Sequence, residues 1–285
     1  MTLRRTGLTA ALTLVLCSSA YAQTLPFEFR VYHKGLRAAA TVPPAEEVDE
    51  EEEAPPLPPA LPPIADPHVA QMRALLHMDS FSGAGPLDEK GGAWVANNVS
   101  VVGGGMYGTG ALAFTHPNSW VEGPNIFFQG ASYTIEAWVK PSSTAGIQPV
   151  VASYSDNAAQ RYFLLTLENG VPRFRFSWVD LSGGAAPANT WTHLAAMHLN
   201  GGFYLYVNGV QVGSIYQTDM YPNSTMRTTL GNTYNSSGMM GAAGMTTFQG
   251  LMDEVRLTRA ARYAMPNGYQ ALPSFEVPDR PYANP

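Results

Sequence analysis

The sequence predicts an all-β fold, an antiparallel sandwich of two sheets. Three apolar-rich runs follow one another closely: Trp191–Leu199, Phe203–Val207 and Val210–Ile215. Asn200-Gly201-Gly202 separates the first two runs, and Asn208-Gly209 separates the second two. Asn-Gly between alternating hydrophobic residues is typical of a type I′ hairpin turn, because both central residues need a positive φ. The three runs therefore predict an antiparallel meander.

The composition agrees with a sandwich. The chain has 285 residues, of which 45% are hydrophobic and 11% aromatic. This is enough material for one large β domain, since such domains run to ~200–250 residues. The 27 glycines and 23 prolines, with only 13% charged residues, favour short strands and tight turns over long solvated helices.

The net charge of −6 comes largely from one segment. Seven acidic residues lie within Glu46–Glu53, whereas 13 acidic and 11 basic residues follow from His68 onward. A nearly neutral domain without a basic stripe lacks the electrostatic footprint of a nucleic-acid-binding protein. We therefore expect no nucleic-acid partner.

The first 22 residues have the pattern of a bacterial-type secretory signal. Arg4 and Arg5 precede the apolar run Leu8–Cys17, and Ala20-Tyr21-Ala22 forms an A-x-A cleavage site. The apolar run is about ten residues long and a membrane span needs ~20, so we expect no transmembrane anchor. The pattern predicts a secreted, periplasmic or cell-surface protein, cleaved after Ala22.

Cys17 leaves a lipoprotein alternative open. Lipoprotein signals place a small residue before the cysteine, and here that residue is Leu16. With cleavage after Ala22, the mature chain contains no cysteine, which excludes disulfide and thiol chemistry.

Four further segments follow the signal. Residues 23–40 contain the alternating stretch Phe27–Tyr32, either an edge strand or a peptide that pairs with another subunit. Residues 41–67 form an acidic, proline-rich linker, which predicts an extended spacer rather than a binder of calcium or of a cationic surface. Residues 68–265 form the domain, and residues 266–285 a proline-rich tail.

Within the domain, period-two alternation and turn residues predict further strands. They are expected at Ala74–Met78 (after a possible helical turn from Gln71), Val99–Val102, Tyr107–Phe114, Tyr133–Lys140, Pro149–Tyr154, Arg161–Glu168, Val171–Trp178, Arg227–Leu230 and Thr247–Thr258. Met239–Met245 has no regular period and is expected to be mobile or an irregular cover.

Three ordered segments resemble a known family. They are the meander, with W-T-H-L-A and L-Y-V-N-G-V-Q-V-G; Y-T-I-E-A-W-V-K at Tyr133–Lys140; and L-M-D-E-V-R-L at Leu251–Leu257. These segments resemble laminin-G-like domains of the concanavalin A-like lectin jelly-roll family. The tail resembles that of phage and bacterial members. The resemblance implies a two-sheet jelly roll, which in this family serves both glycan binding and glycan hydrolysis.

The residues do not predict catalysis. A retaining glycosidase needs two carboxyl groups about 5–5.5 Å apart. Glu136 stands alone in its strand, and Asp253 and Glu254 are neighbours, so they point to opposite faces. His193 and His198 are five residues apart on a strand, so they face opposite sides and cannot share a metal. His193 matches a buried position of the family.

Calcium is the one cofactor that the family resemblance suggests. Relatives often hold Ca²⁺ between an early strand and the closing strand, with carboxylates and carbonyls as a hard cation requires. The matching ligands here are Asp253, Asp79 and the carbonyl of Gly108. Thr115-His116 replace an acidic pair found in many relatives, so this chain has fewer potential calcium ligands than those relatives.

Trp120, Tyr234 and Asn235 are the candidate ligand-binding residues, because sugar sites combine aromatic platforms with amides. Trp138 and Trp178 are further candidates, although a sandwich also needs such residues in its core. The sequence thus predicts a secreted, non-enzymatic binding or adhesion protein that recognises a glycan or surface protein. It does not predict the oligomeric state. The alternatives are a phage-derived structural protein and a glycan-active enzyme.

Overall fold

The computed structural model describes residues 66–126, 128, 130–155, 157, 161–217 and 225–285. The chain divides into two units, residues 1–57 and 58–285, and all described residues belong to the second. The predicted signal, Cys17, the segment 23–40 and the linker up to residue 65 lie outside the described residues. Among the described residues, no helix has the length and hydrophobicity needed to span a bilayer.

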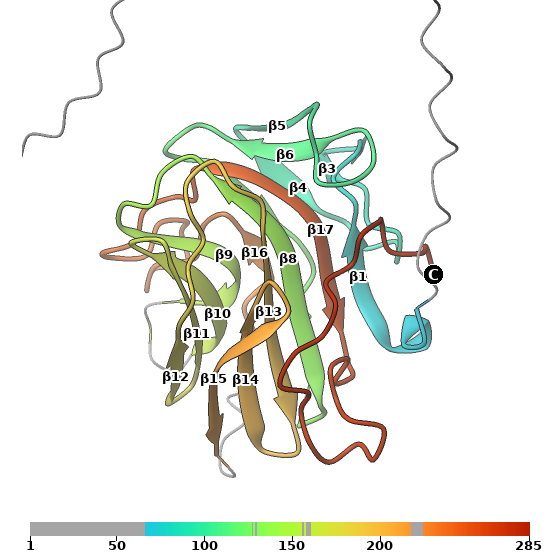
Figure 1. Cartoon of the computed structure of the whole chain (residues 1–285). Helices are drawn as coiled ribbons and strands as arrows, with labels where there is room; N and C mark the ends of the chain where they lie inside the picture. The colour runs from blue at the N-terminus through green and yellow to red at the C-terminus, as the bar shows by residue number, and fades with distance from the viewer. Residues whose placement is uncertain (1–65, 127, 129, 156, 158–160, 218–224) are drawn as a thin grey trace, which may run out of the picture. The chain divides into compact units, whose positions relative to one another are not determined.

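Two antiparallel sheets form the described domain (Figure 1). In the described part of the chain, the larger sheet has eight strands: β15 (Val210–Tyr216), β14 (Gly202–Val207), β13 (Thr192–Leu199), β8 (Tyr133–Pro141), β17 (Gly250–Thr258), β6 (Ala111–Phe114) and β5 (Val99–Val102) in spatial order, with β1 (Met72–Leu76) also paired to β17.

The smaller sheet has seven described strands. Their order is β12 (Val179–Ser182), β11 (Val171–Phe176), β10 (Arg161–Glu168), β9 (Ile147–Tyr154), β16 (Thr229–Leu230), β7 (Trp120–Glu122) and β4 (Val95–Asn97). A 3-10 turn η1 (Val69–Gln71) precedes β1, and a short hairpin joins β2 (Phe81–Ser82) to β3 (Gly85–Pro86). The predicted all-β sandwich is confirmed.

The core lies between the two sheets. In β8, Tyr133, Ile135, Ala137 and Val139 point inward and are buried, as the alternation predicted. Each fully buried aliphatic or aromatic side chain contributes about 1.5–3 kcal/mol of transfer free energy, so this shared core is the main stabilising feature of the sandwich.

The predicted hairpin turns are present. Asn208 and Gly209 have φ of 48° and 75°, and Asn169 and Gly170 have φ of 52° and 80°. Both pairs thus adopt the left-handed conformation that type I′ turns require. Asn208 is held further by its Oδ1 atom, which accepts the backbone N–H of His193 at 2.8 Å.

Four predicted strands are shorter than expected: β16 begins only at Thr229 and β17 only at Gly250, and two others have a clear physical cause. The strand predicted at Tyr107–Phe114 is ordered as β6 only from Ala111, because the preceding loop is tied to carboxylates instead of a neighbouring strand. β11 ends at Phe176, since Ser177 takes a φ of 52° and starts a turn. Trp178 therefore does not share the buried face of β11, and its side chain is 78% exposed.

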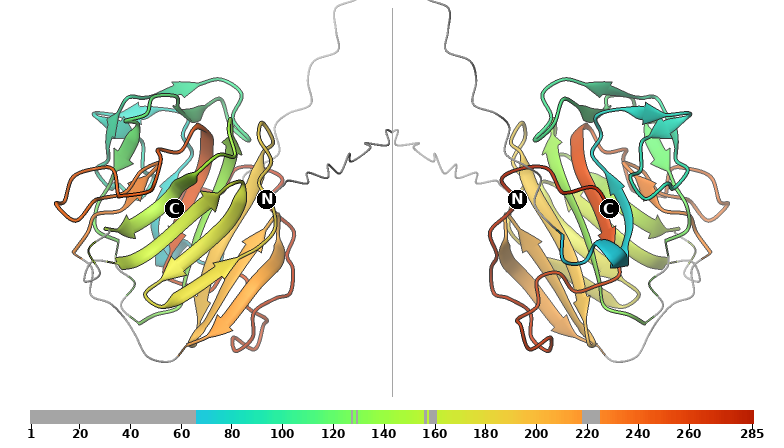
Figure 2. Two further views of the ribbon diagram at one scale, coloured as in Figure 1. Left: turned by 90° about the vertical axis from the view of Figure 1, so that its left-hand side faces the viewer. Right: turned by 90° about the vertical axis from the view of Figure 1, so that its right-hand side faces the viewer.

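Residues 259–285 run along the face of the larger sheet that points away from the smaller one (Figures 1 and 2). We call this segment the C-terminal strap. The Tyr263 and Phe275 rings stack with centroids 3.4 Å apart, and Tyr206 on β14 donates a hydrogen bond to the Leu272 carbonyl at 2.9 Å. The predicted tail thus packs against the sheet and closes its outer face.

Candidate functional site

A buried charge cluster lies beneath the strap. Arg256 Nε lies 2.7 Å from Glu136 Oε1, and Asp66 pairs with Arg262 at 2.8 Å. Burial would raise the pKa of Glu136, but the charges of Arg256 and Arg262 and the hydrogen bond to His193 hold it well below its usual range. Glu136 is therefore an ionised partner of Arg256 and Arg262 within the fold.

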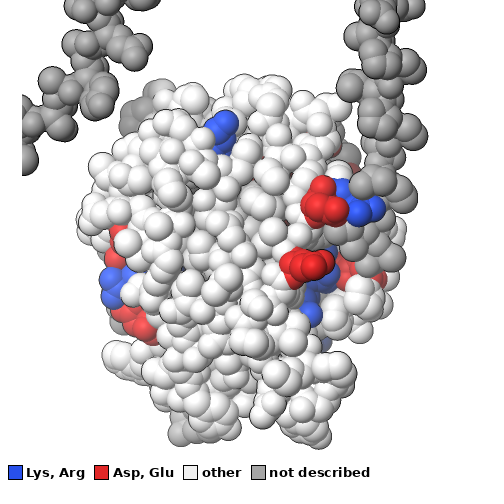
Figure 3. Space-filling model, in the orientation of Figure 1, with Lys and Arg blue, Asp and Glu red and all other residues white. Residues whose placement is uncertain are grey.

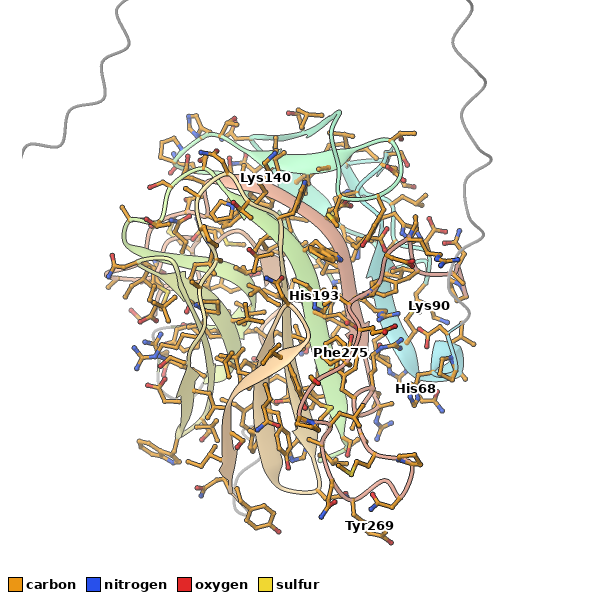
Figure 4. The ribbon with its side chains drawn as sticks, in the orientation of Figure 1. His68, Lys90, Lys140, His193, Tyr269 and Phe275 are labelled. Carbon is orange, nitrogen blue, oxygen red and sulfur yellow. The ribbon has the colours of Figure 1, made fainter. Side chains whose placement is uncertain are left out.

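The strap seals this cluster from solvent. The hydroxyl groups of Tyr263 and Tyr282 both donate to Glu136 Oε2, and the Tyr282 ring lies 3.2 Å from the Arg256 guanidinium carbon. Figure 4 shows Phe275 of the strap in front of the sheet that carries His193. The strap thus covers the part of the outer face that carries Glu136 and Arg256.

The two strand histidines lie on opposite faces, as predicted. His193 is fully buried on the outer face, with Nε2 3.4 Å from Glu136 Oε2. His198 lies on the inner face against the rings of Tyr133 and Phe203. Neither position allows them to share a metal ion.

Asp79 and Asp253, the candidate calcium ligands, both anchor the loop before β6. Asp79 Oδ1 accepts the N–H groups of Thr109 and Gly110, each at 2.6 Å. Asp253 Oδ2 accepts those of Met106 and Tyr107 at 2.7 and 3.1 Å. Burial raises the pKa of Asp253 to about 7, against the opposing effect of these hydrogen bonds.

This donor set does not fit a calcium ion. Calcium takes six to eight oxygen ligands, whereas Asp79 Oδ1 and both carboxylate oxygens of Asp253 here accept backbone N–H groups. The described residues contain no group of three or more His, Cys, Asp or Glu side chains that could hold a metal. Gly108 fits the loop for another reason: its φ is 63°, and an added Cβ would lie 2.3 Å from Asp79 Oδ2. The carboxylates support the loop directly.

A β-bulge in β17 changes the expected direction of one side chain. The pairing with β8 shifts between Asp253 and Arg256, and Glu254 has a φ of 48°. The side chains of Asp253 and Glu254 therefore both point to the outer face of the larger sheet, and the prediction that they point to opposite faces is wrong. Glu254 Oε1 lies 2.6 Å from His77 Nδ1, and its Oε2 accepts the Tyr282 N–H at 3.2 Å.

An open groove lies beside β7 and the stretch 232–249. Its larger hollow has a volume of about 600 Å³. An indole, three methionines, three amides and two hydroxyls contribute to its lining: Pro117, Asn118, Trp120, Asn232, Met239, Met240, Gly241, Met245, Thr246, Thr247 and Gln249. Of the predicted ligand-binding residues, Trp120 lies in this lining.

Tyr234 and Asn235 are not in the lining of this hollow, but they lie next to the stretch that carries its methionines. Tyr234 is buried and donates a hydrogen bond to Glu122 Oε2 at 2.6 Å. Asn235 Oδ1 accepts the N–H groups of Ser237 and Met239 at 2.9 and 3.0 Å. These bonds fold the stretch 235–241 into the methionine-bearing wall, so Tyr234 and Asn235 act as supports of the wall.

A second hollow of about 400 Å³ adjoins the first through Gln249. Phe114, Thr115, Lys140, Ser142, Asn189, Gln249, Gly250 and Leu251 line it. The Gln249 backbone is fixed from both sides, because its N–H donates to Gln148 Oε1 and its carbonyl accepts the Ser142 N–H, each at 2.9 Å. We call the two hollows together the end groove.

The sequence did not identify most of the end groove. Gln249 and Lys140 lie at strand ends and carry no motif. The available signal was the long stretch 231–249, rich in glycine and methionine between two strands, which is typical of a functional loop. Trp138 lies under the strap beside His193 and Tyr107, and Trp178 lies outside the lining.

Comparison with known proteins supports the fold. A family model described as the concanavalin A-like lectin/glucanases superfamily matches residues 114–264. No curated protein sequence matches the chain.

Solved structures show the same fold at low identity. Trypanosoma rangeli sialidase aligns at a TM-score of 0.53 and 15% identity, over 67% of this chain and 31% of that one. The binding domain of botulinum neurotoxin serotype D aligns at 0.52 and 12%, over 71% and 51%. Domain 4 of an extracellular arabinanase from Geobacillus stearothermophilus aligns at 0.49 and 20%, over 67% and 94%. The chain thus spans about half of the toxin domain and a third of the sialidase.

Proposed function

The chain belongs to the concanavalin A-like lectin/glucanases superfamily, and we propose that it is an exported, non-enzymatic binding protein that holds a saccharide in the end groove. The observation that carries this proposal is the lining of the groove, in which Trp120 lies among amide and hydroxyl side chains. Export follows from the signal pattern of the first 22 residues.

The lining suits a sugar in two ways. An indole presents a flat apolar surface with a polar edge, which matches the apolar face of a pyranose ring. Asn118, Asn232 and Gln249 supply donors and acceptors for hydroxyl groups around it. The volume of the larger hollow also lies within the range of about 300–1,000 Å³ found for small-ligand sites.

Binding without cleavage follows from the placement of the acids. Glycoside hydrolysis uses two carboxyl groups about 5–5.5 Å apart, or about 6.5–9.5 Å apart in inverting enzymes. Among the described residues, neither hollow of the end groove has an acidic side chain in its lining. Glu136, the sequence's one candidate for a catalytic carboxylate, is buried and ionised beneath the strap. The fold neighbours include both a binding domain and a sialidase, so the fold alone does not distinguish binding from hydrolysis.

A glycan array tests the proposal. The full chain would be labelled and applied as wild type, as Trp120→Ala, and as Trp178→Ala. Trp178 is the matched control, because it is exposed and lies outside the groove. We expect wild type and Trp178→Ala to retain the same glycans, and Trp120→Ala to bind about tenfold more weakly, the factor given by ~1.4 kcal/mol.

Thermal melting of each variant separates loss of binding from loss of folding. If Trp120→Ala melts like wild type and keeps its binding, the ligand lies elsewhere and the proposed site is wrong. If wild type retains no glycan at all, the proposed function is wrong.

A further inference from the structure

Lys140 gives the end groove a charge that the proposed function does not use. It stands at the end of β8, opposite Leu251 in the strand pairing, and lines the smaller hollow. Among the described residues, it is the one charged side chain in the lining of either hollow, and it has no ion-pair partner there.

The surroundings of Lys140 leave this charge unbalanced. Figure 4 labels it at the upper end of the sheet, and Figure 3, in the same orientation, shows an isolated basic patch there without an acidic patch beside it. The other charges on this face lie in mixed acidic and basic groups, such as Arg173 with Glu168 and Asp180. An unpaired cation inside a concave, partly apolar site interacts more strongly with an anion than one on an open surface, because it is less screened by solvent.

Part of the lining of the larger hollow is apolar. Met239, Met240 and Met245 line the larger hollow together with Trp120. Methionine side chains are flexible and polarisable, so they adapt to small apolar groups such as a methyl. Gln249 lines both hollows, so a ligand that contacts its amide can reach the methionine wall on one side and the hollow of Lys140 on the other.

We infer that the end groove takes an acidic saccharide with N-acetyl groups, whose carboxylate or sulfate pairs with Lys140 while an acetyl methyl packs on the methionine wall. This inference rests on the proposed function, since it names the class of saccharide for the same groove. No bond is made or broken. The ligand is selected by one charge in the smaller hollow and one apolar contact in the larger hollow, and Gln249 lines both.

Four oligosaccharides of matched length separate the two requirements. Chitin oligosaccharide carries N-acetyl groups without acid, hyaluronan adds carboxylates, keratan sulfate adds sulfates, and oligogalacturonate carries carboxylates without N-acetyl groups. In calorimetric titrations of the full chain, hyaluronan or keratan sulfate should bind at least about tenfold more tightly than both chitin oligosaccharide and oligogalacturonate. Which of the two acids binds better identifies the anion.

Two variants test which residues contact the anion and the N-acetyl group of the ligand. Lys140→Gln should lower the affinity for the acidic ligand about fivefold or more. It should also remove most of the salt dependence of this affinity, because salt screens the attraction between the Lys140 ammonium and the anion of the ligand. Lys90→Gln is the control, since Lys90 is exposed and lies outside the end groove. Met239→Ser with Met245→Ser should weaken the N-acetylated ligands and leave oligogalacturonate unchanged.

The outcomes are distinct. If chitin oligosaccharide binds as tightly as hyaluronan and keratan sulfate, or if Lys140→Gln binds the acidic ligand like wild type, the inference is wrong while saccharide binding stands. If none of the four binds but the array retains a neutral glycan, the inference is again wrong. If no saccharide binds in either assay, the proposed function itself fails.

Discussion

Arg256 and Glu136 form an ion pair with both side chains at most 2% exposed, and the strap covers it. One partner comes from the closing strand β17 and the other from the central strand β8, at a register where the two strands pair directly. The pair therefore links two neighbouring strands in the middle of the larger sheet, beneath the C-terminal strap. Glu136 therefore stabilises the fold, and it is not part of the end groove.

Glu136→Gln tests that assignment. The substitution removes one of the two carboxylates that Arg256 and Arg262 share and leaves only Asp66, and breaking a buried pair costs about 3–5 kcal/mol. We expect the midpoint of urea denaturation to fall accordingly, whereas Glu276→Gln, at an exposed position of the strap, should change little. A Glu136→Gln protein of unchanged stability that had lost an activity on polysaccharides would support the enzyme alternative instead.

Stability should depend on pH through His77. Burial alone would lower its pKa, but the hydrogen bonds to Glu254 and Asn284 and the charge of Glu254 raise it to about 9. A histidine whose folded pKa lies above its unfolded value of ~6.5 contributes stability that is complete below pH ~6.5 and is lost as the pH rises through ~9. We expect the free energy of unfolding to fall by up to about 3 kcal/mol over this range.

His77→Gln provides the control for this titration. It should be less stable than wild type at pH ~6 and should show a flatter profile between pH ~6.5 and ~9. Parallel profiles for the two proteins would show that another group causes the pH dependence.

Gly108→Ala should destabilise the loop before β6. The residue has a φ of 63°, and its Cβ would meet the Asp79 carboxylate that holds Thr109 and Gly110. A strained backbone position of this kind costs about 1–3 kcal/mol, measurable as a lower melting temperature. Gly103→Ala is the matched change, because Gly103 lacks a positive φ and has open space around its Cβ position. Equal melting temperatures for the two variants would contradict the anchoring role of Asp79.

Calcium should leave the melting temperature unchanged. Asp79 and Asp253 already accept backbone N–H groups with the oxygens that a cation would need. Melting curves with EDTA and with millimolar calcium should therefore superimpose. A calcium-dependent rise that is abolished by Asp79→Asn and by Asp253→Asn would restore the calcium site that the family resemblance raised.

The sequence predicted the sandwich because its signals are local. Asn208-Gly209 and Asn169-Gly170 specify their turns through backbone conformation alone, and the alternation in β8 specifies which face is buried. Family resemblance then placed these hairpins in the order of a jelly roll.

The remaining features depend on contacts between distant residues. The bulge at Glu254 is stabilised by His77 and Tyr282, which lie 177 and 28 residues away in the chain. The end groove depends likewise on Lys140 and Gln249 meeting at the ends of β8 and β17. Local periodicity carries no information on either arrangement, so only Trp120 of the groove lining was identified in advance.

The central claim is that the end groove holds a saccharide without cleaving it. The most direct measurement is a calorimetric titration of the full chain with a glycan that the array retains, followed by chromatography of that glycan after prolonged incubation with the protein. The account predicts saturable binding that Trp120→Ala weakens, with the glycan recovered at its original length. Shortened products in the wild-type sample that are absent from a no-protein control would contradict it.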